Sequence, residues 1–352
     1  MTVDLAFSRE KHIGLITLTR PKALNALTLP MITALQQQLQ LWQDDESIHA
    51  VVIQAEAGKA FCAGGDVRWL YEQGLAKNTE QKQFFWHEYR LNYFIHHYKK
   101  PYIALMNGIT MGGGVGLSLH GSHPVATENF IFAMPETGIG FFPDVGASFL
   151  LARCPGEAGV YLGLTGSRLN ADEAYSLRLV KSVVNSKHLP EVLATLVETD
   201  LSRDAHNRIS ACLQKFAQST SQKFSILQQA TIDSYFAKGT VEEILRALAK
   251  KGDEWSLATI KTLEKKSPLS LKITFEQIKK AKSFSMEACI KMDYVLVNHF
   301  MQNQDFYEGV RALLVDKDNS PNWQPQTLNQ VSETQVADYF ARLDTLELPL
   351  FS

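Results

Sequence analysis

The sequence has little of what marks secreted, membrane-spanning or nucleic-acid-binding proteins. Only four cysteines occur among 352 residues, and no two of them have the CxxC spacing of a zinc or redox site. We therefore expect reduced thiols. No segment reaches the roughly 18 consecutive apolar residues that a membrane-spanning helix requires. The formal net charge of −2 leaves no basic excess for nucleic acid. We expect a protein that binds neither nucleic acid nor membrane.

Targeting and metal-binding signals are also missing. The first residues, Met-Thr-Val-Asp-Leu-Ala-Phe, contain no basic, long apolar or Arg/Ser-rich leader, so we expect a cytoplasmic protein. Of the ten histidines, the pairs His96-His97 and His120-x-x-His123 have no carboxylate or cysteine partner at helical metal-ligand spacing, so we expect no metal. With 45% hydrophobic and 20% charged residues, the composition is ordinary for a chain that buries a core.

Two carboxylates stand in the apolar, Gly/Pro-rich stretch Phe132-Ala-Met-Pro-Glu-Thr-Gly-Ile-Gly-Phe-Phe-Pro-Asp144. Burial disfavours the ionised form of Glu136 and Asp144 unless each is paired or used. Such carboxylates are candidates for a general base or a nucleophile. The alternative is that Glu136 caps a helix after Pro135 and that Asp144 caps the next turn.

Two glycine-rich turns precede that stretch. One is Phe61-Cys-Ala-Gly-Gly-Asp66, and the other is Asn107-Gly-Ile-Thr-Met-Gly-Gly-Gly-Val-Gly116. Each follows an apolar strand-like run and leads into a predicted helix, where backbone N–H groups can face a ligand. If the turns converge they form an oxyanion hole, worth roughly 3 kcal/mol per donor. A phosphate cradle and simple close packing are the competing interpretations. Leu117 stands where a dinucleotide-binding fingerprint needs its third glycine, and no Walker motif is present.

These motifs occur in an order that resembles the crotonase (enoyl-CoA hydratase/isomerase) superfamily: Arg20-Pro-Lys-Ala-Leu-Asn-Ala-Leu27, then the two glycine turns, then Met134-Pro-Glu136. The chain is most similar to the 3-hydroxyisobutyryl-CoA hydrolase branch. That closer likeness rests on three segments. The first two are Gly108-Ile-Thr-Met-Gly-Gly-Gly-Val-Gly-Leu117 and Phe132-Ala-Met-Pro-Glu-Thr-Gly-Ile-Gly-Phe-Phe-Pro-Asp-Val-Gly146. The third, late in the chain, is Asp305-Phe-Tyr-Glu-Gly-Val-Arg-Ala-Leu-Leu-Val-Asp-Lys-Asp-Asn-Ser-Pro-Asn-Trp323. The resemblance extends from about residue 3 to about residue 330.

The resemblance implies an α/β fold, a crotonase-like spiral of repeated ββα units with a C-terminal helical region. We expect an acyl-CoA-binding spiral core over 1–195 and the helical region over 196–352. Apolar periodicity predicts strands at 12–18 and 50–55 and a helix at 29–42. Further helices are predicted around 241–248 and 271–278, the second beginning at Ser267-Pro268. A peripheral helix and tail are expected in the last 25 residues or so.

The resemblance also implies residue roles. Gly65 and Gly113 would donate their N–H groups to a thioester carbonyl. Glu88, in Glu88-Tyr-Arg-Leu-Asn92, would line the pocket, although a solvated helix carboxylate is the alternative. The residues implied in contacts with coenzyme A are Lys22, Ala23, Leu24, Ala63, Asp66 and Val67. Coenzyme A is part of the substrate, so no separate cofactor is expected.

One departure selects among the relatives. Family members that hydrate enoyl-CoA carry a second catalytic Glu where this chain has Gly116, and glycine supplies no acid or base. The resemblance therefore implies hydrolysis of a short 3-hydroxyacyl-CoA thioester of the kind met in valine catabolism. Glu136 would act as base or as covalent nucleophile, and Asp144 would position the substrate hydroxyl or the water. The alternatives are an enoyl-CoA isomerase and a non-catalytic acyl-CoA- or RNA-binding protein. A homo-oligomer is also expected.

Overall fold

The computed structural model describes residues 4–219, 226–341 and 347–350. Its strands form two sheets, one with six strands in the order β1-β2-β3-β5-β7-β9 and one with three in the order β4-β6-β8. The strands are β1 Leu5–Glu10, β2 Ile13–Leu18, β3 Ala50–Ala55, β4 Ala60–Cys62, β5 Tyr102–Met106, β6 Ile109–Met111, β7 His123–Thr127, β8 Ile131–Ala133 and β9 Ser182–Val184.

The chain winds as a spiral, as the resemblance to the crotonase superfamily implies. Each turn adds one strand to the larger sheet, then one to the smaller sheet, and then a helix: β3 and β4 are followed by helices, as are β5 with β6 and β7 with β8. All pairs after β2 are parallel, whereas β1 and β2 form an antiparallel hairpin. The carboxyl ends of β4, β6 and β8 consequently lie side by side, and the motifs singled out in the sequence follow directly after them.

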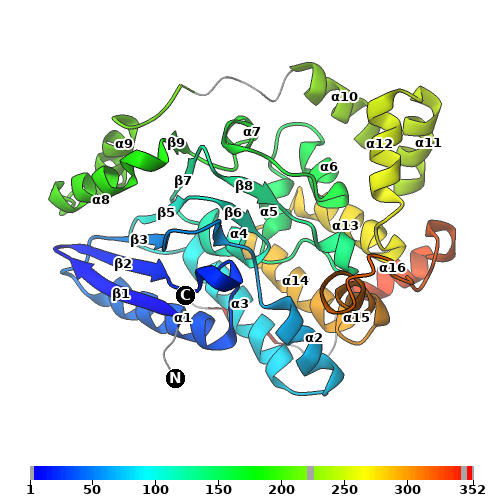
Figure 1. Cartoon of the computed structure of the whole chain (residues 1–352), viewed down its shortest axis with the longest axis horizontal. Coiled ribbons are helices and arrows are strands. Elements are labelled where there is room, and N and C mark those ends of the chain that lie inside the picture. Colours follow the sequence, from blue (N-terminus) through cyan, green and yellow to red (C-terminus); the bar gives the residue numbers. More distant parts are fainter. Residues whose placement is uncertain (1–3, 220–225, 342–346, 351–352) are drawn as a thin grey trace.

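The helices fall into two groups after the last strand (Figure 1). In this view α8 and α9 lie on the left, against the large sheet, and α10 to α16 lie from the centre to the right. The helices up to that point are α1 Leu29–Asp44, α2 Val67–Leu75, α3 Glu80–His96, α4 Gly113–Ser118, α5 Ala147–Leu151, α6 Ala158–Thr165 and α7 Ala171–Ser176. Those that follow are α8 Leu189–Glu198, α9 Ala205–Gln214, α10 Ile226–Phe236, α11 Val241–Lys251, α12 Glu254–Leu263, α13 Pro268–Ala281, α14 Met286–Phe300, α15 Gln304–Val310 and α16 Glu333–Tyr339.

The large sheet is buried on both faces. In β2, Ile16 and Leu18 face the core shared with α1 and α3, whereas Ile13 and Leu15 face the smaller core beneath α8 and α9. The alternation predicted for 12–18 is present, but its second face is also covered, as is usual for parallel sheets packed between helices. Helix α9 packs with α8, and the boundary expected at residue 195 falls inside α8. The division into two domains stays a prediction.

Several predicted elements agree with the structure closely. The strand predicted at 50–55 is β3, and the helix predicted at 29–42 is α1, which continues to Asp44. Helix α13 begins at Pro268, and its cap is Ser267, whose hydroxyl accepts a hydrogen bond from the Ser270 N–H. Part of the expected C-terminal tail lies outside the described residues, and α16 is the peripheral helix before it.

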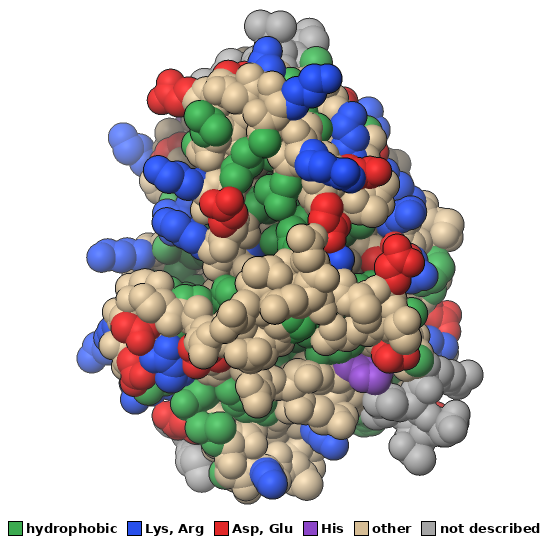
Figure 2. Space-filling view, turned by 90° about the vertical axis from the view of Figure 1, so that its right-hand side faces the viewer, with side chains coloured by type: hydrophobic (Ala, Val, Ile, Leu, Met, Phe, Trp, Pro, Cys, Tyr) green, Lys and Arg blue, Asp and Glu red, His purple; other side chains and the backbone are tan. Residues whose placement is uncertain are grey.

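The surface does not concentrate charge of one sign on the face over the C-terminal helices. Figure 2 shows Lys and Arg side chains interspersed with Asp and Glu around apolar patches on that face. In the part of the chain that the structure describes, no helix is both long and apolar enough to cross a bilayer.

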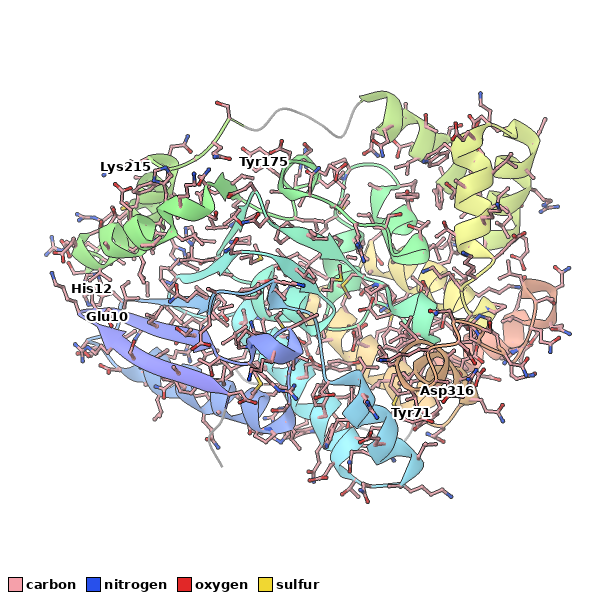
Figure 3. The ribbon with its side chains drawn as sticks, viewed as in Figure 1. Glu10, His12, Tyr71, Tyr175, Lys215 and Asp316 are labelled. Carbon is pink, nitrogen blue, oxygen red and sulfur yellow. The ribbon has the colours of Figure 1, made fainter. Side chains whose placement is uncertain are left out.

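Helix α15 belongs to the late signature, and it joins the C-terminal helices to the spiral. Tyr71 of α2 and Asp316, just beyond α15, are labelled at the lower right of Figure 3, where these elements lie together. The rings of Tyr71 and Tyr307 are 6.2 Å apart. A Cβ atom built on Gly140 would lie only 2.1 Å from the carbonyl oxygen of Asp305. The turn containing Glu136 is therefore in direct backbone contact with α15.

That contact predicts a strong penalty for Gly140→Ala. Gly140 has φ +68° and no room for a methyl group, whereas Gly252 has φ +66° and its nearest neighbour, the Ala249 carbonyl oxygen, would be 3.6 Å away. Gly252→Ala is thus a matched control, because it introduces the same backbone strain without a steric clash. We expect Gly140→Ala to lower the free energy of unfolding by about 3 kcal/mol and Gly252→Ala by about 1 kcal/mol. Urea denaturation measures both, and equal losses would contradict the packing argument.

Candidate active site

The two glycine turns converge. A Cβ atom built on Gly64 would lie 3.6 Å from the Gly113 nitrogen, and one built on Gly113 would lie 3.4 Å from the Gly65 nitrogen. Gly64 and Gly112, immediately before these two residues, have φ of +112° and +49°, conformations that side-chain-bearing residues rarely adopt. The convergence expected from the sequence is therefore present.

Among the described residues, neither the Gly65 nor the Gly113 N–H group has a backbone acceptor. Gly113 is the first residue of α4, so its N–H has no acceptor within the helix. Gly65 follows β4 and is bridged to Leu27 through its neighbours: Leu27 N–H donates to the Gly64 carbonyl, and Asp66 N–H donates to the Leu27 carbonyl. Within the described residues neither glycine N–H donates to a backbone carbonyl, so both are available to an oxygen atom placed between the turns.

Helix α3 presents one face to these turns through Phe84, Glu88 and Asn92. Spaced four residues apart, they lie one above the other on the helix. A Cβ atom on Gly65 would lie 2.9 Å from the Phe84 ring, and one on Gly113 would lie 2.5 Å from Glu88 Oε1. Helix α3 can approach this closely only because the facing residues lack side chains.

Three carboxyl groups gather here from separate elements. Glu136 begins the 3₁₀ turn η2, Glu136–Ile139, and its Oε1 would lie 3.1 Å from a Cβ atom on Gly112. Asp144 Oδ2 accepts a 2.8 Å hydrogen bond from the Tyr89 hydroxyl. Glu88, Glu136 and Asp144 expose only 2%, 6% and 6% of their surface. In the described part of the protein, Glu88 Oε1 and Glu136 Oε2 are buried without a hydrogen-bond partner.

Burial and mutual repulsion keep protons on this cluster. Burial raises the pKa of Asp144 to about 7, although the Tyr89 hydroxyl opposes the rise. Burial, and then the charges of Asp144 and Glu136, raise the pKa of Glu88 well above its ordinary value. Burial and the charge of Asp144 do the same to the pKa of Glu136. Carboxyl groups held in this way are suited to proton transfer near neutral pH.

Neither Glu136 nor Asp144 acts as a helix cap. Glu136 is inside its turn, whose N-cap is Pro135, and no side chain hydrogen-bonds to that end. Helix α5 begins after Gly146, again without a side-chain cap. The capping alternative for these two carboxylates is therefore wrong.

The loop around Asp144 is held from three sides. The Gly146 N–H donates to Asp293 Oδ2 at 2.8 Å, Gln277 Nε2 donates to the Pro143 carbonyl at 3.0 Å, and His120 Nε2 donates to the Val145 carbonyl at 2.8 Å. Gln277 and Asp293 come from α13 and α14 and are also bonded to each other. The contacts of Gln277 and Asp293 could not be predicted from the sequence, because these two residues are more than 130 positions from the loop that they hold.

The residues expected to contact coenzyme A occupy two adjacent loops. The Ala63 N–H donates to the Leu24 carbonyl at 3.0 Å, which joins the segment of Lys22, Ala23 and Leu24 to that of Ala63, Asp66 and Val67. Lys22 is exposed. Asp66 has structural partners, because its Oδ1 caps α2 at the Trp69 N–H and its Oδ2 pairs with Arg20 at 3.0 Å.

One cation near the carboxyl cluster is not foreseen from the sequence. Lys266 Nζ would lie 3.1 Å from a Cβ atom on Gly138, in the turn that begins with Glu136. Burial lowers the pKa of Lys266, while the charge of Glu136 opposes the change. No group of three or more His, Cys, Asp or Glu side chains suited to a metal ion occurs among the residues described.

Comparison with known proteins identifies the family. A family model for enoyl-CoA hydratase/isomerase matches residues 13–340. The chain belongs to the enoyl-CoA hydratase/isomerase family. It is 45% identical over 352 residues to a protein of Danio rerio named 3-hydroxyisobutyryl-CoA hydrolase, mitochondrial, with 99% of this chain and 92% of that protein covered. The Homo sapiens protein of the same name is 42% identical over 350 residues, with 98% and 90% covered.

Solved structures of enoyl-CoA hydratase/isomerase relatives share the whole fold. A carnitinyl-CoA dehydratase from Mycobacterium thermoresistibile has a TM-score of 0.90 and 35% identity, with 99% of each chain covered. An enoyl-CoA hydratase from Rhodobacter sphaeroides has a TM-score of 0.89 and 35% identity, with 97% of this chain and 98% of that one covered. The crotonase-like spiral with its C-terminal helices is therefore confirmed.

The raised pKa of Asp144 predicts how stability depends on pH. Between the unfolded value of 3.8 and the folded value of about 7, the native state holds a proton that the unfolded state has lost. Ionising the buried carboxyl as the pH rises therefore destabilises the fold, by up to a few kcal/mol at about 1.4 kcal/mol per pKa unit. The Asp144→Asn variant does not have this loss. The free energy of unfolding of the variant, minus that of the native protein, should therefore increase from pH 4.5 to pH 8.

Urea denaturation at pH 4.5, 6 and 8 measures that trend. Asp200→Asn is the control, because Asp200 is exposed and its hydrogen bonds from Ser202 lower the pKa of its carboxyl group, whereas burial raises that of Asp144. Its stability difference should stay constant. If the difference in free energy of unfolding between Asp144→Asn and the native protein also stays constant with pH, Asp144 titrates as an ordinary carboxyl group.

Proposed function

We propose that this protein hydrolyses a short 3-hydroxyacyl-CoA thioester of the 3-hydroxyisobutyryl-CoA type, releasing the hydroxy acid and free coenzyme A. The observation that carries the proposal is Glu136, buried with an unpartnered Oε2 beside two converging turns whose N–H groups are free. The names of relatives that are 40–45% identical over nearly the whole chain support the same reaction.

The free N–H groups of Gly65 and Gly113 suit the thioester carbonyl. Its oxygen would accept both hydrogen bonds, and these strengthen as negative charge develops on the oxygen during attack. The donors need no reorganisation, since the preceding glycines, Gly64 and Gly112, hold them in place in conformations that other residues rarely adopt. The Gly113 N–H also starts α4, where the end of the helix favours negative charge.

Glu136 can serve the reaction in two ways. As a general base it would take a proton from water while the water oxygen attacks the carbonyl carbon. As a nucleophile its carboxylate would attack that carbon itself and form an anhydride, which water then opens. In both routes the C–S bond breaks, and the sulfur of coenzyme A leaves as a thiol once it is protonated. The half-buried cation Lys266 supports the ionised form of Glu136.

Asp144 and Glu88 would then arrange the rest of the substrate. Asp144 is fixed by the Tyr89 hydroxyl on one side and by the clamped loop on the other, so it can hold a water or a hydroxyl group in a set position. Glu88 is adjacent to Gly113, where it would line the acyl pocket. Lys22, exposed on the first coenzyme A loop, is placed to pair with a phosphate.

Hydration of a C=C bond is disfavoured at this site. It calls for a second acid or base on α4, and the position available there is Gly116. A Cβ atom on Gly116 would lie 2.5 Å from Asn92 Nδ2 and 2.9 Å from Val145 Cβ, so a larger residue does not fit. The relatives named 3-hydroxyisobutyryl-CoA hydrolase are called mitochondrial in their names. For this chain, a cytoplasmic location, a homo-oligomer and a part in valine breakdown stay predictions.

A panel of acyl-CoA thioesters tests the reaction. We expect release of free thiol from 3-hydroxyisobutyryl-CoA and 3-hydroxypropionyl-CoA, and negligible hydration of crotonyl-CoA. A thiol-reactive chromophore follows release with little background, because all four cysteines of the protein are buried. Hydration or double-bond migration without thiol release would replace the hydrolase with a hydratase or isomerase. Binding without any turnover would favour the non-catalytic alternative.

Glu136→Gln tests the chemistry. The substitution keeps shape and hydrogen bonding but removes both basicity and nucleophilicity, so kcat should fall by at least about 10²–10⁴-fold. Substrate binding should change little, as expected for a group that acts in the transition state. Glu128→Gln is the matched control, since Glu128 bonds to Ser186 away from the turns. Near-native turnover by Glu136→Gln would assign the base to another residue, with Glu88 tested next.

A further inference from the structure

Asn92 is an unexplained polar side chain in the candidate active site. It is fully buried, and among the residues described neither its Nδ2 nor its Oδ1 has a hydrogen-bond partner. Buried amide groups are almost always paired, and leaving one unpaired costs about 1–3 kcal/mol per group. A side chain with both polar atoms unsatisfied at such a place indicates a ligand that completes it.

The surroundings show where Asn92 points. Its Nδ2 would be 2.5 Å from a Cβ atom on Gly116, so the amide fills the space that a side chain at residue 116 would take. Asn92 is one helical turn beyond Glu88 on α3, and Gly116 is about one turn beyond Gly113 on α4. The amide therefore lies further along the same wall that carries the free Gly113 N–H.

We infer that Asn92 is a substrate-specificity residue whose side-chain amide hydrogen-bonds the 3-hydroxyl group of the bound acyl chain. The inference rests on the proposed function. With the carbonyl oxygen at Gly113, the 3-carbon is two bonds beyond the carbonyl carbon, and a hydroxyl on it extends toward the next helical turn, about 5.4 Å along α4.

The chemistry of the amide fits a hydroxyl better than the neighbouring carboxylates do. A hydroxyl group both donates and accepts, and a carboxyl group donates only while it is protonated. Asn92 offers a donor in Nδ2 and an acceptor in Oδ1 at every pH, and it adds no further acidic group to the cluster. With the hydroxyl on Asn92, Asp144 is left to position the attacking water.

Binding measurements on a slow variant test Asn92 apart from hydrolysis. Calorimetric titration of Glu136→Gln with 3-hydroxyisobutyryl-CoA and with isobutyryl-CoA gives the preference for the hydroxyl. Adding Asn92→Ala should weaken binding of the hydroxylated thioester roughly 10- to 100-fold and that of isobutyryl-CoA less than threefold. Asn92→Leu, which keeps the branched shape of the side chain and removes the hydrogen bonds, should give the same selective loss.

Asn298→Ala is the matched control. Asn298 is another buried helical Asn, but its Nδ2 is bonded to the Tyr294 carbonyl on α14. This variant should leave the preference for the hydroxylated ligand intact. Equal weakening of both ligands by Asn92→Ala and Asn92→Leu, or no change in either, would overturn the inference.

The proposed function and the role of Asn92 can fail separately. If the native protein releases no thiol but the preference for the hydroxyl still depends on Asn92, the hydrolase assignment fails and the specificity residue stands. If thiol is released and the preference survives in both Asn92 variants, the reverse holds.

A second readout tests whether Asn92 occupies the space over Gly116. Gly116→Ala should lower Tm by several degrees in the native background and by clearly less in the Asn92→Ala background, since the closer clash, with Asn92, is then relieved and only the one with Val145 Cβ is left. Equal shifts in the two backgrounds would mean that the amide points elsewhere, and the inference would fall.

Discussion

The site depends on the close packing of helix α3 against backbone that carries no side chains. Phe84, Glu88 and Asn92 face Gly65, Gly113 and Gly116, and at each contact a single added carbon atom would be within 3 Å of the helix. The same glycines turn their N–H groups toward the space between the turns. One constraint therefore sets both the position of the α3 side chains and the exposure of the backbone donors.

That packing also explains how charge is brought into the interior. Tyr89, next to Glu88 on α3, reaches Asp144, whose loop is fixed in turn by Gln277 and Asp293. Ionised carboxylates are costly at this depth, and the protein retains three within one cluster instead of replacing them with apolar residues. The spiral and the C-terminal helices supply the hydrogen bonds that hold Asp144, so the two parts of the chain build one site.

Local patterns predicted local structure well. The β-branched run of β3, the apolar stripe of α1 and the Ser-Pro start of α13 each contain enough information within a few residues. The glycine turns and the Glu136 stretch could also be located from the sequence, because glycine and buried acid are rare in such contexts. The resemblance implied that the two glycine turns lie together, and in the structure a Cβ atom on Gly113 would be 3.4 Å from the Gly65 nitrogen.

Long-range partners could not be predicted in this way. From the sequence, Tyr89 is one of several aromatic residues of a core helix. Its hydroxyl group bonds to Asp144, which is 55 positions away, so the sequence pattern does not indicate this contact. Asp293 reads as an ordinary acid in an amphipathic helix. Asn92 could have been found, because it follows Glu88 at the four-residue spacing that puts two side chains on one face. The second buried face of β2 was missed because α8 and α9 cover it from much later in the chain.

The clamp on the Asp144 loop has a consequence for how the protein matures. Its donor on α13, Gln277, and its acceptor on α14, Asp293, are encoded 134 and 147 positions after the backbone groups that they hold. During synthesis the spiral leaves the ribosome first, and domains fold from the N-terminal side as they emerge. The glycine turns can thus be assembled while Asp144 still lacks its supports and while the Glu136 turn still lacks its contact with α15. A nascent chain therefore passes through a stage in which the two glycine turns are formed and the loops of Glu136 and Asp144 are not yet held, and the candidate site is complete only when the last quarter of the chain has docked.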